Sequence, residues 1–455
     1  MGGNMLKQTG YSREAPLLPA ILRFSIPLML TGILQLAYNT ADSIIVGRYA
    51  GHASLAAVGS TTSIIFLIIT LFNGVSIGAN YMAARDFGAQ DDRGLFRTVH
   101  CAALLSVILG LLACVCGLLL STPLLRWADA PEDVLPLSVL YLRIYFLGVP
   151  ALVVYNFGSA LLRAVGDTFY PLLFMIVSGA LNVALNLLLV VVIPLDVAGV
   201  AIATSVSQLL SAVLVTVRLC TFRGPCRLDL RKIRLYPDRT GQMLRLGFSA
   251  GLQGVLFSAS NVMIQSAINS FGSTVVAGSS ASANLEGFVY TAMNAFAQAA
   301  VTFTSQNMGA RRYDNLDRVM RNCLLCAAVT GLVLGGGASL LGEPLLHFYS
   351  SDEVVVTAGL ARMHIICTTY LLCGCMDVLA SCLRGRGYSV LPMVVSLVGS
   401  CLLRLVWIAT IFRLFHTTTM LYLSYPVSWI LTALVHLACL LVVRHKMNTA
   451  LSVKA

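Results

Sequence analysis

Twelve apolar runs, each long enough to cross a lipid bilayer, follow one another along this chain of 455 residues. A span needs about 20 mostly apolar residues, and in lipid a helix can satisfy all of its own backbone hydrogen bonds. We place the runs at 18–46, 54–81, 98–122, 135–162, 168–194, 197–219, 244–270, 275–304, 319–342, 353–381, 388–413 and 420–443. They predict an all-α integral membrane protein with twelve transmembrane helices.

The composition excludes a soluble globular domain and an intrinsically disordered chain. Apolar residues make up 58% of the chain and charged residues only 11%, whereas a soluble domain carries about 25% charged residues. Intrinsic disorder requires low hydrophobicity and is excluded as well. Most of the thirteen cysteines lie inside the apolar runs, where a cysteine behaves as a small hydrophobic side chain, so no disulfide framework is expected.

Basic residues are concentrated on one side of the predicted membrane. With the N-terminus in the cytoplasm, 24 of the 30 Lys and Arg fall in cytoplasmic segments, three in outer loops and three within spans. This asymmetry is a strong positive-inside signal and predicts that both termini are cytoplasmic. It also explains the net charge of +11 without a nucleic-acid partner.

The two halves of the chain resemble each other at an offset of 221 residues. The segment Leu162-Arg163-x-x-Gly166-x-x-x-x-Pro171 recurs as Leu383-Arg384-x-x-Gly387-x-x-x-x-Pro392, Gly88-Ala89 as Gly309-Ala310, and Gly51 as Gly272. Six helices in each repeat make the repeats parallel, with a pseudo-two-fold axis along the membrane normal, as in many alternating-access transporters. We predict an N-lobe at 1–221, a basic cytoplasmic linker at 222–243 with membrane lipids beside it, and a C-lobe at 244–455.

Motifs for energy-converting or catalytic chemistry are missing from the sequence. None of the four lysines is followed by Ser or Thr, so no P-loop is present, and no His is followed by Glu, so no H-E-x-x-H metalloprotease motif is present. We expect no enzyme, no catalytic residue and no cofactor. Uphill transport would then draw on an ion gradient or a partner. A passive pore stays an alternative that the repeat disfavours.

Three carboxylates fall inside predicted spans: Asp42, Glu286 and Asp377. A charge at the centre of a span costs roughly 2.5–3.5 kcal/mol on insertion scales, so such residues usually handle ions or substrates. Asp86 and Asp167 lie at span ends, where we interpret them as structural.

Asp42 shares one helix face with two other polar residues, Gln35 and Tyr38, at spacings of i, i+3 and i+7. This stripe predicts an ion or proton site facing an internal cavity; the alternative is a carboxylate paired with an arginine. Further polar residues in the first half could complete the site or form ordinary interhelical hydrogen bonds: Asn156, Asn182, Asn186 and Thr204. One carboxylate with neutral oxygens suits Na⁺, and a lone carboxylate can carry a proton.

The second half offers Glu286 and Asp377, the latter at offset 221 from Asn156. Either could bind a cationic substrate or a second ion, or could bridge helices. Arg143 and Arg362 are the salt-bridge partners available in the spans, unless they extend to the interface.

At these residues the chain resembles the multidrug and toxic compound extrusion (MATE) transporters of the multidrug/oligosaccharidyl-lipid/polysaccharide exporter superfamily. The resemblance covers roughly 15–445. It rests on Ile26-Pro27…Asp42-x-x-x-Val46-Gly47, on both Leu-Arg-x-x-Gly segments, and on Ser305-Gln306-Asn307-x-Gly309-Ala310.

The resemblance implies two six-helix lobes around a V-shaped cavity and antiport of Na⁺ or H⁺ against organic cations. It implies that the N-lobe ion site is formed by Asp42, Asn156, Asn182, Asn186 and Thr204, with Gln35 and Tyr38 lining the cavity. Many members carry Asp where this chain has Asn186, which favours a proton on Asp42. The seventh span reads Phe257-Ser258-Ala259-Ser260-Asn261 and lacks the glutamate of some members.

We therefore expect a monomeric multidrug antiporter in the cell membrane of a bacterium, exporting amphipathic organic cations. The alternative is a flippase or exporter of a lipid-linked saccharide, which would need basic residues in the cavity to hold a pyrophosphate.

Overall fold

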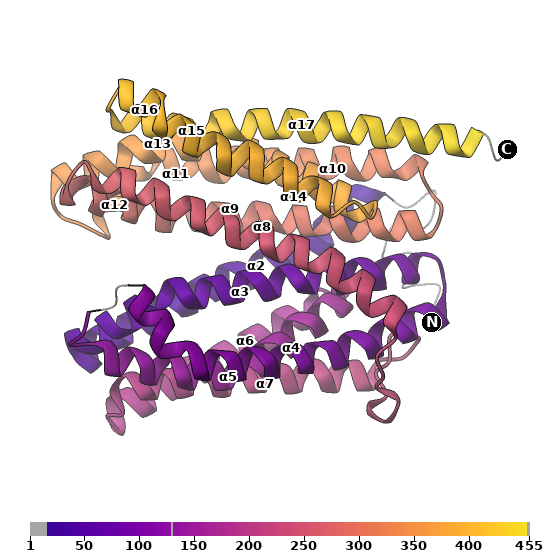
Figure 1. Ribbon diagram of the computed structural model, residues 1–455, viewed down its shortest axis with the longest axis horizontal. Coiled ribbons are helices and arrows are strands. Elements are labelled where there is room, and N and C mark those ends of the chain that lie inside the picture. The colour runs from indigo at the N-terminus through magenta and orange to yellow at the C-terminus, as the bar shows by residue number, and fades with distance from the viewer. Residues whose placement is uncertain (1–15, 129–130, 453–455) are drawn as a thin grey trace. The chain divides into compact units, whose positions relative to one another are not determined.

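The computed structural model describes residues 16–128 and 131–452, and every regular element in that part of the chain is helical (Figure 1). The long helices are α2 (Leu17–Ile45), α3 (Gly51–Gly88), α4 (Asp92–Trp127), α5 (Leu135–Ala164), α6 (Phe169–Asn186), α7 (Asp196–Thr221), α8 (Pro237–Asn269), α9 (Ser273–Gly309), α10 (Asp314–Thr330), α13 (Glu353–Gly385) and α17 (Thr418–Ser452). Shorter helices are α11 (Gly336–Leu340), α12 (Gly342–His347), α14 (Val390–Ser396), α15 (Leu403–Ala409) and α16 (Ile411–Leu414). The prediction of an all-α membrane protein is confirmed.

Several spans contain a π-helical turn, where the backbone is locally wider than in an α-helix. These turns are η1 (Val46–Ala50), η2 (Leu187–Val192), η4 (Gly331–Gly335) and η5 (Leu397–Leu402). π-Bulges are frequent at functional sites. Two of them directly follow predicted site residues, since η1 begins four residues after Asp42 and η2 begins one residue after Asn186.

Ten helical stretches in the described residues are long and apolar enough to cross a membrane. The other two predicted spans correspond to α8 and α9, which have 33 and 37 residues. Their length suffices at 1.5 Å per residue, but Gly, Ala, Ser and Asn take many places that larger apolar residues fill elsewhere. Such small residues permit close helix packing rather than lipid contact.

The backbone repeats at the same offset of 221 as the sequence. Positive φ angles occur in three matching pairs: Gly51 (81°) with Gly272 (89°), Gln90 (54°) with Arg311 (55°), and Gly166 (90°) with Gly387 (91°). Such angles are rare except in glycine. Each pair lies at the equivalent helix end, so the internal repeat includes the turns as well as the helices.

The chain forms two compact units. The N-terminal unit runs from Leu30 to Gly251, and the C-terminal unit combines the chain up to Met29 with the chain from Leu252 onward. The division therefore falls inside α2 and inside α8. The two boundaries are 222 residues apart, within one residue of the repeat offset of 221. The predicted lobes follow the sequence repeat instead, and their bounds stay a prediction.

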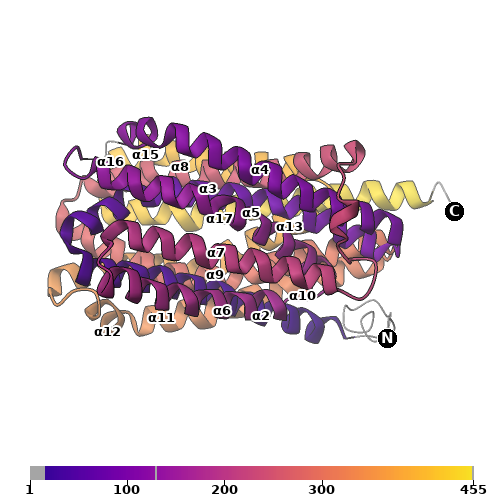
Figure 2. The same ribbon diagram turned by 90° about the horizontal axis from the view of Figure 1, so that it is seen from below.

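In the N-terminal unit, α5 packs against α3, α4 and α7, and α6 packs against α7 (Figures 1 and 2). Its buried core includes Val46, Ala57, Tyr141, Val190 and Val200. These residues come from η1, α3, α5, η2 and α7, so the core joins helices distant in sequence and includes the π-helical turns that follow α2 and α6.

The first part of α8 packs backbone to backbone with α3. Each helix carries a Gly-x-x-x-Gly pair, Gly74 and Gly78 in α3 and Gly247 and Gly251 in α8. A Cβ atom on Gly74 would lie 2.2 Å from Cα of Gly251, and one on Gly78 would lie 2.2 Å from the carbonyl oxygen of Met243. No larger residue fits, so these glycines set the contact between the two helices.

In the C-terminal unit, α13 packs against α9, α10 and α17 (Figure 1). The core of this unit includes residues from the beginning of α2, among them Ile21 and Phe24, next to Phe296, Phe303 and Leu379. Phe24 and Phe303 meet edge to face with ring centroids 5.4 Å apart. The first turns of α2 are thus part of this unit.

Candidate functional site

Asp42 lies one turn before the end of α2 and is bonded to α6. The Asn186 Nδ2 atom donates a hydrogen bond of 2.5 Å to Asp42 Oδ1, and a longer one of 3.4 Å to Asn182 Oδ1. Asn186 is fully buried and Asn182 nearly so, while Asp42 is half-buried. The i, i+4 spacing of the two asparagines on α6 brings their amides together, and Asn186 connects them to the carboxylate.

Two buried polar atoms of predicted site residues lack partners among the described atoms. They are the Asn186 Oδ1 acceptor and the Asn156 Nδ2 donor. An unsatisfied buried polar group is expensive, at about 1–3 kcal/mol. Such atoms are typical of a site that binds something else. The oxygens of Asp42, Asn182 and Asn186 fit a monovalent cation or a proton. The described residues contain no group of His, Cys, Asp and Glu suited to a metal such as zinc.

The remaining predicted residues of the first half contribute differently. Thr204 donates to the backbone oxygen of Val200 in its own helix, so its hydroxyl is not bonded to the cluster. The ring of Tyr38 packs against Gly179 on α6, where a Cβ atom would lie 1.9 Å from it. Gln35 is half-buried on α2 one turn earlier. The structure thus joins Asp42, Asn182 and Asn186 by direct bonds, and Tyr38 holds α2 against α6 beside them.

Sequence reasoning missed two tyrosines on α5. Tyr141 and Tyr145 are buried and stack with ring centroids 6.5 Å apart. The charge of Asp42 acts on Tyr141, so this tyrosine belongs to the electrostatic surroundings of the cluster. Their i, i+4 spacing on an apolar helix was the available signal.

Glu286 is part of a buried ion pair in the C-terminal unit. Both of its carboxylate oxygens accept hydrogen bonds of 2.8 Å from Arg362, through Nε and Nη2. Ser282 also donates to Glu286, and Arg362 donates to Ser279. Only 3% of Glu286 and 7% of Arg362 are exposed. Of the two expected partners, Arg362 forms the salt bridge, whereas Arg143 is exposed.

Asp377 forms the end of a second polar cluster in the same unit. It hydrogen-bonds to the Tyr290 hydroxyl, which in turn accepts from Asn294, and Gln298 donates to Asn294. Arg384 lies about two turns further along α13, on the same face as Asp377. Its charge acts on Asp377, and it donates a 2.6 Å hydrogen bond to Gln253. Sequence reasoning found Asp377 but missed its partners on α9, although Tyr290, Asn294 and Gln298 are spaced four residues apart.

Arg404 is another buried arginine of the C-terminal unit, with 3% exposed. Its Nε atom donates to Ser428, and its guanidinium lies 4.3 Å from the ring centroid of Tyr425 and 5.7 Å from that of Trp429. Aromatic rings thus take the place of a carboxylate among its described neighbours.

The two carboxylates interpreted as structural are tied to basic residues at helix ends. Asp86 accepts two bonds of 2.9 and 2.8 Å from Arg239 and one of 2.6 Å from Thr98. Asp167 pairs with Arg218 at 3.1 Å. The Asp86–Arg239 pair fastens the beginning of α8 to the N-terminal unit, together with the glycine contact.

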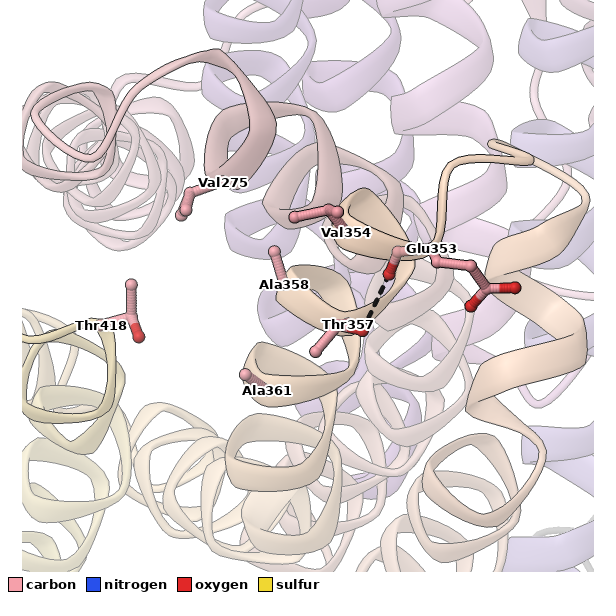
Figure 3. Close-up of a pocket in the computed structure, with 7 residues that line it drawn as sticks. All are labelled: Val275, Glu353, Val354, Thr357, Ala358, Ala361 and Thr418. Atoms are coloured by element: carbon pink, nitrogen blue, oxygen red, sulfur yellow. Dashed lines mark hydrogen bonds between the residues drawn. The ribbon is translucent and has the colours of Figure 1, made fainter.

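A separate open pocket lies at the beginning of α13 and contains none of these residues (Figure 3). It is lined by Val275, Glu353, Val354, Thr357, Ala358, Ala361 and Thr418. Thr357 bonds to the backbone oxygen of Glu353 at 2.8 Å, as Figure 3 shows, and the Glu353 carboxylate points away from the small apolar side chains. The pocket is therefore distinct from the Asp42 cluster.

Known proteins share both the sequence pattern and the fold. A family model described as MatE matches residues 27–188 and 250–410, once in each repeat. The probable multidrug resistance protein YoeA of Bacillus subtilis (strain 168) is 26% identical over 381 residues, which are 82% of each chain. The multidrug export protein MepA of Staphylococcus aureus (strain NCTC 8325 / PS 47) is 19% identical over 84% of each chain.

Solved structures agree. A crystal structure of a MATE protein in the straight conformation has a TM-score of 0.89 at 22% identity, over 98% of this chain and 99% of that one. An outward-facing multidrug resistance MATE family transporter has a TM-score of 0.87 at 23% identity, over 94% and 96%. The family model covers more than half of the chain, so the resemblance inferred from the motifs is confirmed, and this chain belongs to the MatE family of membrane transporters.

Proposed function

We propose that this chain is a secondary active multidrug exporter of the cell membrane. It exchanges H⁺ or Na⁺ for amphipathic organic cations by alternating access between two lobes, residues 1–221 and 244–455, and works as a monomer with both termini in the cytoplasm. Family membership and the two bacterial relatives named as multidrug proteins support the transport class.

The observation that carries the ion coupling is the partly buried hydrogen bond between Asp42 and Asn186. An ionised Asp42 only accepts hydrogen bonds, so it takes the Nδ2 side of the amide. A protonated Asp42 can donate, and Asn186 Oδ1 is the buried acceptor that has no other partner. Proton uptake therefore favours a flipped Asn186 side-chain amide, with Oδ1 toward Asp42, and a different packing of α2 against α6.

This exchange of donor and acceptor links the ion to the transported compound. An ionised Asp42 attracts a cationic compound, whereas a protonated Asp42 does not. Because linkage is reciprocal, bound compound lowers the affinity for the proton, and the proton expels the compound. The π-helical turns next to Asp42 and Asn186 are the segments where α2 and α6 can change their winding.

Na⁺ could act at the same residues. It would use the carboxylate of Asp42 with the amide oxygens of Asn182 and Asn186, after Asn186 has turned over. Because Asn186 is neutral, the site carries the single negative charge of Asp42, and we favour the proton.

The charges of the cluster support cationic rather than anionic compounds. Asp42 has no basic partner among the ion pairs of the described residues, whereas Arg362 is neutralised by Glu286. A lipid-linked pyrophosphate would need several free basic groups, whereas Arg404 is bonded to Ser428 beside the ring of Tyr425, and buried Arg386 donates to the backbone oxygen of Cys382. The flippase alternative is therefore the weaker one.

Efflux of ethidium from energised vesicles tests the proposal, with a proton gradient alone, a Na⁺ gradient alone, or neither. We expect efflux with one gradient and its loss in Asp42→Asn. Asp196→Asn is the matched control, because Asp196 is exposed and has a φ of 47° that asparagine readily adopts. Full gradient-driven efflux in a folded Asp42→Asn protein would refute the coupling scheme.

A further inference from the structure

The connection between α7 and α8, residues 222–236, presents basic side chains beside exposed leucines. We call this segment the basic loop. Its exposed basic residues are Arg223, Arg227, Arg231, Lys232 and Arg234. Leu230 is 60% exposed and Leu235 37% exposed, and both alternate with the basic residues. A surface that combines positive charge with apolar tips is unusual for a segment that faces only water.

Buried residues and a hydrogen bond anchor the basic loop to the neighbouring helices. Phe222, Cys226 and Leu228 are 1–4% exposed and fix it to the ends of the helices. The His100 Nε2 atom on α4 accepts a 3.0 Å hydrogen bond from the backbone N–H of Asp229. These anchors turn the basic residues and the leucines outward while the buried residues point inward.

The charge of the loop is not compensated. Its five basic residues face one acidic residue, Asp229, which leaves a net charge of +4. Asp229 accepts from the backbone N–H of Arg231 and pairs with Lys232 at 3.4 Å. The hydrogen bond from Arg231 lowers the pKa of Asp229, so it stays ionised and neutralises one basic residue only.

We propose that the basic loop binds anionic phospholipid headgroups, with Leu230 and Leu235 inserted between them. The membrane-spanning stretch of α7 ends at Thr221, immediately before the loop, so the loop lies where the chain leaves the bilayer. Basic side chains attract anionic lipids there, and leucines gain from the headgroup boundary. A nucleic acid would make no use of the exposed leucines.

A tryptophan reporter in the loop tests this proposal. We would reconstitute Leu230→Trp in vesicles of phosphatidylcholine and phosphatidylglycerol, and brominate one lipid or the other. Leu230→Phe gives the background from the native tryptophans. Brominated phosphatidylglycerol should quench Trp fluorescence with a preference of roughly fivefold or more at equal mole fraction, since each basic residue near the surface contributes about that factor.

Charge variants decide whether the basic residues cause the preference. Arg223→Gln, Arg231→Gln and Arg234→Gln together lower the net charge of the loop from +4 to +1 and should strongly reduce the preference for brominated phosphatidylglycerol. The matched control neutralises three exposed arginines predicted to lie on the other side, Arg48, Arg126 and Arg413, and should leave the preference unchanged. Leu235→Trp is a second reporter if Leu230→Trp folds poorly.

Two results would overturn the proposal. Equal quenching by both brominated lipids would show that anionic headgroups are not selected. Quenching by neither lipid would show that the loop faces water, and a soluble acidic partner would replace the lipid. Both leaflets contain the test lipids, so the orientation of the protein in the vesicle does not affect the result.

Discussion

Breaking the buried ion pair between Glu286 and Arg362 should destabilise the protein strongly. The pair makes two N–O contacts, both 2.8 Å, and its members are almost completely buried. Removal of Arg362 leaves the Glu286 charge with Ser282, and removal of Glu286 leaves the Arg362 charge with Ser279 and the rings of Tyr422 and Tyr425, 5.7 and 5.8 Å away. We expect Glu286→Ala and Arg362→Ala each to lower the free energy of unfolding by about 3–5 kcal/mol.

The double variant separates the pair from its surroundings. Because the second substitution removes the stranded charge, Glu286→Ala/Arg362→Ala should lose little more than either single variant, which gives a coupling free energy of about 3 kcal/mol. Unfolding in mixed detergent micelles, followed by circular dichroism, measures all four proteins.

A more exposed ion pair of the same unit is the control. Arg444 and Asp317 lie 3.0 Å apart, with side chains 55% and 31% exposed. Solvent screening should limit their coupling to about 1 kcal/mol or less. A coupling of Glu286 with Arg362 that is no larger than this control would refute the reasoning, because burial would then not determine the strength of the pair.

Three further predictions concern other parts of the structure. Gly78→Ala should lower the free energy of unfolding by about 1–3 kcal/mol, because its Cβ would overlap the backbone of Met243. Gly59→Ala in the same helix is the control. Its Cβ meets no atom within 4 Å, so it should be neutral or stabilising in the same unfolding assay. Burial raises the pKa of the Cys226 thiol to about 12, so almost no thiolate is present at pH 8. Mass spectrometry should therefore find maleimide on Cys226 only after denaturation. Labelling of Cys226 in the folded protein would contradict its burial. Asn186→Asp should restore a second carboxylate beside Asp42 and increase the Na⁺ dependence of efflux, while Asn186→Leu should weaken gradient-driven efflux, and unchanged ion dependence in both would exclude Asn186 from the site.

The sequence predicted what depends on local periodicity. The apolar runs predicted the helices. The residues that recur at an offset of 221, such as Gly51 with Gly272 and Gly166 with Gly387, lie at turns that share positive φ angles.

Features that depend on contacts between distant helices were less predictable. The sequence offered Arg143 and Arg362 as salt-bridge partners, but only the packing of α13 on α9 shows that Arg362 meets Glu286. The bond from Arg384 to Gln253 joins residues 131 positions apart and had no local signal. The same holds for the contact of α3 with α8, because small residues at i and i+4 reveal a close approach but not its partner.

Ion movement driven by the transported compound tests the central claim most directly. Purified protein in sealed liposomes would receive an outward gradient of ethidium with no ion gradient, and internal pH and Na⁺ would be followed by fluorescent indicators. Antiport at Asp42 predicts that the compound leaves while protons, or Na⁺ if the site selects it, enter in exchange, and that Asp42→Asn abolishes the ion flux. Movement of ethidium with no accompanying ion flux in the unmodified protein would contradict the account and indicate a passive pathway.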